Sequence, residues 1–173
     1  ITHGCTGITV SYSRLHDHWK GSLVGHSDSN GSEDRAITVT YYHNYWYNIN
    51  SRGPSVRFGR AHVVNNYYNN VKDGINTRQG AQVLAQNNVW GVVFPALLNE
   101  IIAAPELTQD IDSGKAVFST DNGYINLSNN DYGGASVNAP TGNFGSAPYG
   151  LNIIATSSVI NTVSNNSGQT LNL

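Results

Sequence analysis

The chain has 173 residues, of which 39% are hydrophobic and only 12% are charged, and its formal net charge is −2. This length suits one domain with a substantial core, and the weak negative charge argues against a nucleic-acid partner. Glycine occurs 18 times and methionine is absent, which is typical of a β-rich chain with many tight turns and argues against a helical bundle. No apolar run is long enough to span a bilayer.

Two stretches alternate between apolar and polar residues, as half-buried β-strands do. They are residues 8–12, with the sequence ITVSY, and residues 37–41, with the sequence ITVTY. Each is therefore predicted to be a strand with one buried face.

Three asparagines recur at a constant spacing, which predicts a repeat architecture. Asn44, Asn66 and Asn88 are 22 residues apart, and an aromatic residue follows two positions after each. A period of this size with strand-like content predicts a β-solenoid whose coils stack about 4.8 Å apart. We expect the asparagines to form a hydrogen-bonded ladder and the neighbouring aromatic side chains to stack. These aromatic residues are Tyr45, Trp46, Tyr67, Tyr68 and Trp90.

The later part of the chain departs from this period. Residues 92–114 are expected to form an insertion between coils, with a short helix over residues 94–104 that starts at a proline. Strands are predicted at Lys115–Ser119 and over residues 124–130. Residues 133–173 are expected to pack along the outside of the solenoid or to be partly mobile. Residues 1–173 are thus predicted to form one domain.

Residues 50–59, NSRGPSVRFG, place Arg52 and Arg57 around a Gly53–Pro54 pair. Proline stiffens the backbone on both sides of its own position, so this segment can aim two long cations at one place. A preorganised anion site is one interpretation, and a surface turn with two solvated arginines is the other.

Other polar residues add candidates for chemistry. Lys20 follows a strand expected over residues 8–15 by a few residues, and Arg52 follows a strand expected over residues 37–45 by a similar offset. Stacking would then bring Lys20, Arg52 and Arg57 to one lateral face, which would suit a polyanionic substrate. The run His16-Asp17-His18 is better explained by a hydrogen-bonded turn than by a metal site. His43 and His62 fall within strand patterns and are expected to be interior or stacking residues. His26 and Asp28 complete the set of candidates.

Two blocks of the sequence resemble the pectate lyases, in the family that also contains the pectin lyases (polysaccharide lyase family 1). They are residues 17–30, DHWKGSLVGHSDSN, and residues 35–71, whose SRGPSVR segment matches the Arg-x-Pro-x-x-Arg signature of that family. The resemblance runs from about residue 1 to residue 130. It implies an all-β fold, a right-handed single-stranded parallel β-helix, and calcium-dependent cleavage of polygalacturonate in pectin by β-elimination.

The resemblance also implies roles for single residues. Arg52 matches the catalytic base, Arg57 matches the substrate-binding arginine, and Lys20 matches the lysine that grips the carboxylate of the sugar to be cleaved. Lys20 favours a pectate lyase over a pectin lyase. The family's calcium-binding aspartates lie before the position of Ile1, so we expect Ca2+ to have no main ligand in this chain. We therefore expect a fragment that is incomplete at its N-terminal end and inactive alone.

Some expectations concern partners and location. Asn-x-Ser sequons at Asn30, Asn126 and Asn165 hint at secretion, and the resemblance implies an extracellular enzyme that is monomeric when full length. We expect polygalacturonate or pectin as substrate, and no nucleic-acid or membrane partner. The alternatives are a non-catalytic β-solenoid that binds acidic polysaccharide, and a pectin lyase.

Overall fold

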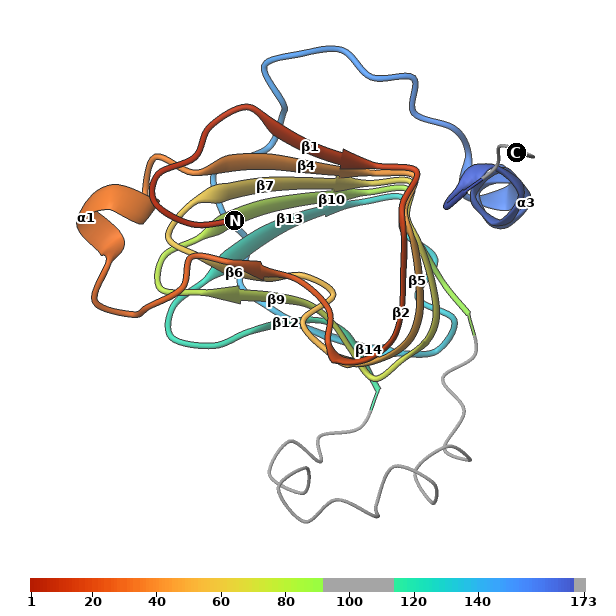
Figure 1. The fold of residues 1–173 in the computed structure, drawn as a ribbon, viewed down its shortest axis with the longest axis horizontal. Helices are drawn as coiled ribbons and strands as arrows, with labels where there is room; N and C mark the ends of the chain where they lie inside the picture. The colour runs from red at the N-terminus through yellow and green to blue at the C-terminus, as the bar shows by residue number, and fades with distance from the viewer. Residues whose placement is uncertain (92–113, 170–173) are drawn as a thin grey trace.

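The structure is a computed structural model that describes residues 1–91 and 114–169. In it the chain winds into a stack of coils, and successive coils supply neighbouring strands to three parallel sheets (Figure 1). The first sheet contains, in spatial order, β1 (Ile8–Ser11), β4 (Thr38–Tyr42), β7 (Arg60–Val64), β10 (Gln82–Gln86) and β13 (Tyr124–Ser128). The second contains β2 (Arg14–Lys20), β5 (Tyr45–Ser51), β8 (Tyr67–Val71) and β11 (Val89–Trp90). The third contains β3 (Leu23–Val24), β6 (Ser55–Arg57), β9 (Asp73–Arg78), β12 (Lys115–Ser119) and β14 (Ser136–Asn138).

This arrangement confirms the predicted all-β parallel β-helix. The strands expected over residues 8–12, 37–41, 115–119 and 124–130 correspond to β1, β4, β12 and β13. The insertion expected over residues 92–114, with its helix, lies outside the described residues except for Gly114. Among the described residues, no helix is long and apolar enough to cross a membrane.

The register between coils follows the repeat that the sequence predicts. Thr38 pairs with Arg60, and Arg60 pairs with Gln82, so each step is one 22-residue repeat. The first coil is longer, since Ile8 pairs with Val39. The additional residues form the loop that carries the short helix α1 (Gly31–Asp34).

The predicted asparagine ladder is confirmed. The backbone N–H and the side-chain Nδ2 of Asn44 both donate to Oδ1 of Asn66, at 3.0 Å each. Asn66 donates to Asn88 in the same way at 2.9 and 3.0 Å, and Asn88 to Asn130 at 2.9 Å twice. Because each amide satisfies a backbone N–H of the neighbouring coil, the ladder locks the coils in register.

The residue before each ladder asparagine adopts a left-handed conformation, which turns the chain from the first sheet into the second. These residues are His43, Asn65, Asn87 and Asn129, with φ between 50° and 56°. Asparagine and histidine tolerate this conformation better than most residues do.

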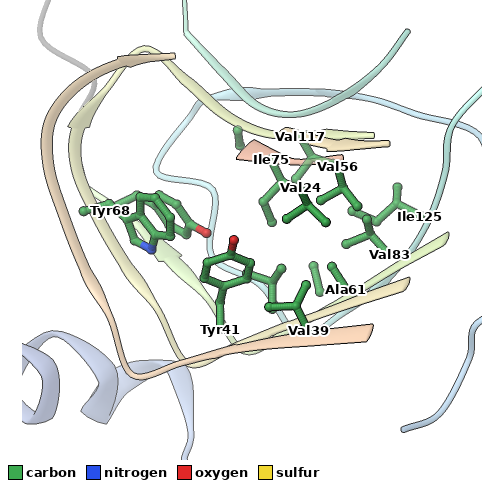
Figure 2. Close-up of a cluster of buried hydrophobic side chains, with 14 of the residues drawn as sticks. Val24, Val39, Tyr41, Val56, Ala61, Tyr68, Ile75, Val83, Val117 and Ile125 are labelled. Carbon is green, nitrogen blue, oxygen red and sulfur yellow. The ribbon is translucent and has the colours of Figure 1, made fainter. Parts of the chain in front are cut away.

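The interior is filled by stacked side chains. Trp46, Tyr68, Trp90 and Tyr132 form one column, with ring centroids 5.7, 4.5 and 5.4 Å apart. Figure 2 shows side chains that fill the space between the first and third sheets, among them Val39, Ala61, Val83 and Ile125 from the first sheet and Val24, Val56, Ile75 and Val117 from the third. The expected aromatic scaffold is therefore present, and Tyr132 extends it.

The C-terminal segment lies against the outside of the coils. Helix α3 (Thr156–Asn166) packs Val159 and Val163 onto Val89 of the second sheet (Figure 1). Arg14 donates from Nε to the carbonyl of Ser167 at 2.9 Å, which satisfies a carbonyl just beyond the end of the helix.

Candidate functional site

Lys20 and Arg52 start from adjacent positions on neighbouring coils. Lys20, the last residue of β2, is in register with Ser51, the last residue of β5. Beyond the strands, Gly21 N–H donates to the Ser51 carbonyl at 2.8 Å, and Ser22 N–H donates to the Arg52 carbonyl at 2.7 Å. The parallel register therefore makes the backbones of Lys20 and Arg52 neighbours at the end of the second sheet.

A glycine permits this close approach. A Cβ atom on Gly21 would lie 2.8 Å from the carbonyl oxygen of Arg52 and 3.2 Å from Cγ2 of Ile49. Any larger residue would push the turn after Lys20 away from Arg52. The backbone separation of the two cations thus depends on residue 21 having no side chain.

Arg52 itself has a left-handed backbone, with φ of 64°. A bulky residue persists in this conformation only where its surroundings impose it, and such residues cluster at functional sites. The following Gly53 N–H donates to the carbonyl of Gly74 on the next coil at 2.9 Å, so the turn is anchored from both sides. Its anchoring agrees with the stiff backbone expected from the sequence.

Arg57 lies at the far end of β6 and is held by two partners. Its Nε donates to Oδ1 of Asp28 at 2.5 Å, and its Nη1 donates to the carbonyl of Gly25 at 2.9 Å. The side chain is only 11% exposed, whereas Lys20 is exposed. Arg52 and Arg57 are five positions apart in the sequence, at most about 18 Å of extended chain. The backbones of Lys20 and Arg52 are thus neighbours, and Arg57 lies on β6 of the third sheet.

The ion pairs of Arg57 continue to the next coil. Arg78 is in register with Arg57, and its Nη2 lies 3.4 Å from Oδ2 of Asp28 and 2.9 Å from Oδ2 of Asp121. The hydrogen bond from Arg57, followed by the charges of Arg57 and Arg78, holds the pKa of Asp28 below its usual value. Asp28 was a candidate from the sequence without an assigned role, and Arg78 was not a candidate, although it follows Arg57 by about one repeat.

The histidines lie elsewhere. His16 Nδ1 is 2.8 Å from Oδ2 of Asp17, and both side chains are exposed, so the run is hydrogen-bonded as expected but lies in β2 rather than in a turn. His43 stacks on Tyr42 with centroids 3.9 Å apart. His62 is 3% exposed, and its Nε2 is 2.8 Å from Gln86 Oε1. Burial lowers the pKa of both His43 and His62.

The described residues do not fit a calcium site. Residues 1–91 and 114–169 contain no group of three or more His, Cys, Asp or Glu side chains that could hold a metal ion. The cations of the candidate site are suited to carboxylate groups instead.

Comparison with known proteins identifies the family. The family model described as "Pectate lyase" matches residues 1–172. Pectate lyase A of Aspergillus niger is 47% identical over 172 residues, which cover 99% of this chain and 47% of that protein. The chain belongs to the pectate lyase family. It spans about half the length of the curated relatives that it matches.

Solved structures of the family share the fold. A pectate lyase from Bacillus sp. N165, in complex with trigalacturonate, is 30% identical with a TM-score of 0.70, and the match covers 94% of this chain and 49% of that one. Pectate lyase C from Erwinia chrysanthemi, at pH 9.5 with 30 mM Ca2+, is 26% identical with a TM-score of 0.69, and the match covers 94% and 46%.

Proposed function

We propose that this chain carries the proton-abstracting and substrate-binding cations of a pectate lyase, which cleaves the (1→4)-α-D-galacturonan of pectin by β-elimination. The observation that supports this proposal is the register of Lys20 with Ser51, the residue directly before Arg52. Membership of the pectate lyase family and the trigalacturonate bound by the Bacillus relative support the substrate class.

In this reaction the base removes the proton on carbon 5 of a galacturonate, next to its carboxylate. The electrons of that bond form a double bond between carbons 4 and 5 while the bond from carbon 4 to the glycosidic oxygen breaks. The leaving oxygen takes a proton from water. Carbon 5 is a weak acid because the adjacent carboxylate is already negative, so the Lys20 ammonium would stabilise the additional charge that develops there.

Arg52 would act as the base in its neutral form. Arginine is normally protonated at all accessible pH values. Positive charge nearby favours the neutral form of a cationic group, and Lys20 starts from the adjacent coil. A small neutral fraction, held in place by the anchored turn, would then increase as the pH rises, so the rate should increase toward alkaline pH.

Arg57 would bind a substrate carboxylate. Asp28 and the Gly25 carbonyl already occupy Nε and Nη1 of Arg57. Among the residues that the structure describes, Nη2 of Arg57 has no hydrogen-bond or ion-pair partner. We assign the contact with substrate to this nitrogen, and its loss should weaken substrate binding as well as lower the rate.

Calcium dependence and secretion belong to the same proposal. The Erwinia relative, solved with Ca2+, supports the ion, and its ligands would have to come from outside the described residues, since these hold no suitable group. We expect the enzyme to be secreted, because its substrate is a polymer of the plant cell wall and lies outside the cell that makes the enzyme.

The test is an assay of the complete gene product that contains residues 1–173 on polygalacturonate with calcium. Formation of an unsaturated product that absorbs in the ultraviolet supports the proposal. Binding of the polymer without this product would instead identify a non-catalytic polysaccharide-binding solenoid. Product formed from highly methylated pectin in the presence of a chelator would identify a pectin lyase.

A further inference from the structure

Asp28 stands between two arginines of neighbouring coils. Arg57 and Arg78 are register partners on β6 and β9, so their side chains start about 4.8 Å apart on the outside of the third sheet. Each oxygen of Asp28 faces one of them: Oδ1 is 2.5 Å from Nε of Arg57, and Oδ2 is 3.4 Å from Nη2 of Arg78. One carboxylate therefore bridges two cations that would otherwise repel each other.

The contacts of Arg57 hold its guanidinium in a fixed position. Gly25 has a φ of 76°, and a Cβ atom there would lie 2.9 Å from Cβ of Arg57. The absence of a side chain lets Arg57 lie against this turn and donate to the Gly25 carbonyl. Nε donates to Asp28 and Nη1 donates to the Gly25 carbonyl. Because the guanidinium is planar, these two hydrogen bonds fix its orientation.

Asp121 has a different relation to the same row. It lies 2.9 Å from Nη2 of Arg78 and is 50% exposed, the same fraction as Asp28. No ion pair joins Asp121 to Arg57 among the residues that the structure describes. The two aspartates therefore match in charge and exposure, but only Asp28 contacts Arg57.

We propose that Asp28 is a positioning residue for the substrate: by bridging Arg57 and Arg78 it fixes the guanidinium of Arg57 so that Nη2 is presented to a galacturonate carboxylate. This inference rests on the proposed function, in which Arg57 binds substrate. It predicts that Asp28 aids the binding of an anion despite its own negative charge. A carboxylate that merely stood near the substrate would weaken that binding by repulsion.

The test compares Asp28→Asn with Asp121→Asn in the complete gene product. An amide at position 28 can accept from one arginine, but its NH2 group then faces the other, so the bridge is lost. We expect KM for polygalacturonate to rise about tenfold in Asp28→Asn, the scale on which an unfixed long side chain weakens binding, while kcat changes less than about threefold. Asp28→Glu restores a carboxylate and should recover most of the affinity.

The control separates positioning from charge. Asp121→Asn removes the same charge and should leave KM unchanged or lower it. If Asp28→Asn also lowers KM or leaves it unchanged, Asp28 is only a competing anion and the proposal is overturned. Calorimetry measures the dissociation constant of trigalacturonate for each variant, and so tests the effect on binding without turnover. The two proposals can fail separately. If the wild type forms no unsaturated product, the lyase activity is refuted. If Asp28→Asn but not Asp121→Asn then weakens trigalacturonate binding, the role of Asp28 still holds.

Discussion

Lys20 is in register with Ser51, so the amine of one coil and the guanidinium of Arg52 on the next start from adjacent ends of parallel strands. The positions of both residues are set by the register of β2 and β5. The same hydrogen-bonded stacking that makes the solenoid also makes the pair, and a change in coil register would separate the two groups.

Replacing Lys20 tests its electrostatic role. Lys20→Gln removes the charge but keeps a long polar side chain, and we expect kcat on polygalacturonate to fall about 10²- to 10³-fold, as when one preorganised donor to a developing anion is removed. Arg60 is exposed on β7 of the first sheet and serves as a charge-matched control. Arg60→Gln should leave kcat within about twofold of wild type, and an equal loss in both variants would show a general charge effect.

Gly21 offers a test of geometry without a change in charge. In Gly21→Ala the new methyl group meets the Arg52 carbonyl at 2.8 Å, so the Lys20 and Arg52 backbones must separate. A displacement of about 1 Å can cost about 10²-fold in rate, and we expect a loss of that order in kcat. Gly150→Ala, where no atom lies within 4 Å of the new Cβ, should have no effect. Full activity of Gly21→Ala would show that the close approach is dispensable.

The asparagine ladder should be a major source of stability. Asn66 is fully buried and joins Asn44 on one side to Asn88 on the other. Asn66→Ala leaves several buried groups without partners, each at a cost of about 1–3 kcal/mol, so we expect the melting temperature to fall by about 6 °C or more. Circular dichroism measures this change. The exposed Asn165→Ala on α3 should shift it by less than about 2 °C, and similar melting of the two variants would contradict the ladder's role.

The lowered pKa of His62 predicts that the free energy of unfolding falls in acid. Burial lowers the pKa of His62 in the folded chain, so below the unfolded value of about 6.5 the unfolded chain binds a proton that the folded chain resists. Stability should therefore fall as the pH drops through this value, until the folded pKa is reached. In His62→Gln the fall in melting temperature between pH 7 and pH 5 should be smaller than in wild type.

The repeat could be predicted because ladder and stacking positions tolerate few residue types, so Asn44, Asn66 and Asn88 mark the period in the sequence itself. Asn130 fills the same position, yet it comes 42 residues after Asn88, and the residues in between hide the period. The neighbouring backbone positions of Lys20 and Arg52 could be predicted from the coil register. The pairing of Arg57 with Asp28 could not, because Asp28 lies in the loop that lengthens the first coil, where no repeat sets the path of the chain.

The most direct test of the account is the turnover of Arg52→Lys in the complete gene product, followed by ultraviolet absorbance of the unsaturated product from polygalacturonate. Lysine keeps the positive charge but not the guanidine that would take the proton from carbon 5. We predict a fall in kcat of at least about 10²-fold, with the rate of the wild type increasing toward alkaline pH. An Arg52→Lys variant that keeps most of the wild-type turnover would contradict the assignment of Arg52 as the base.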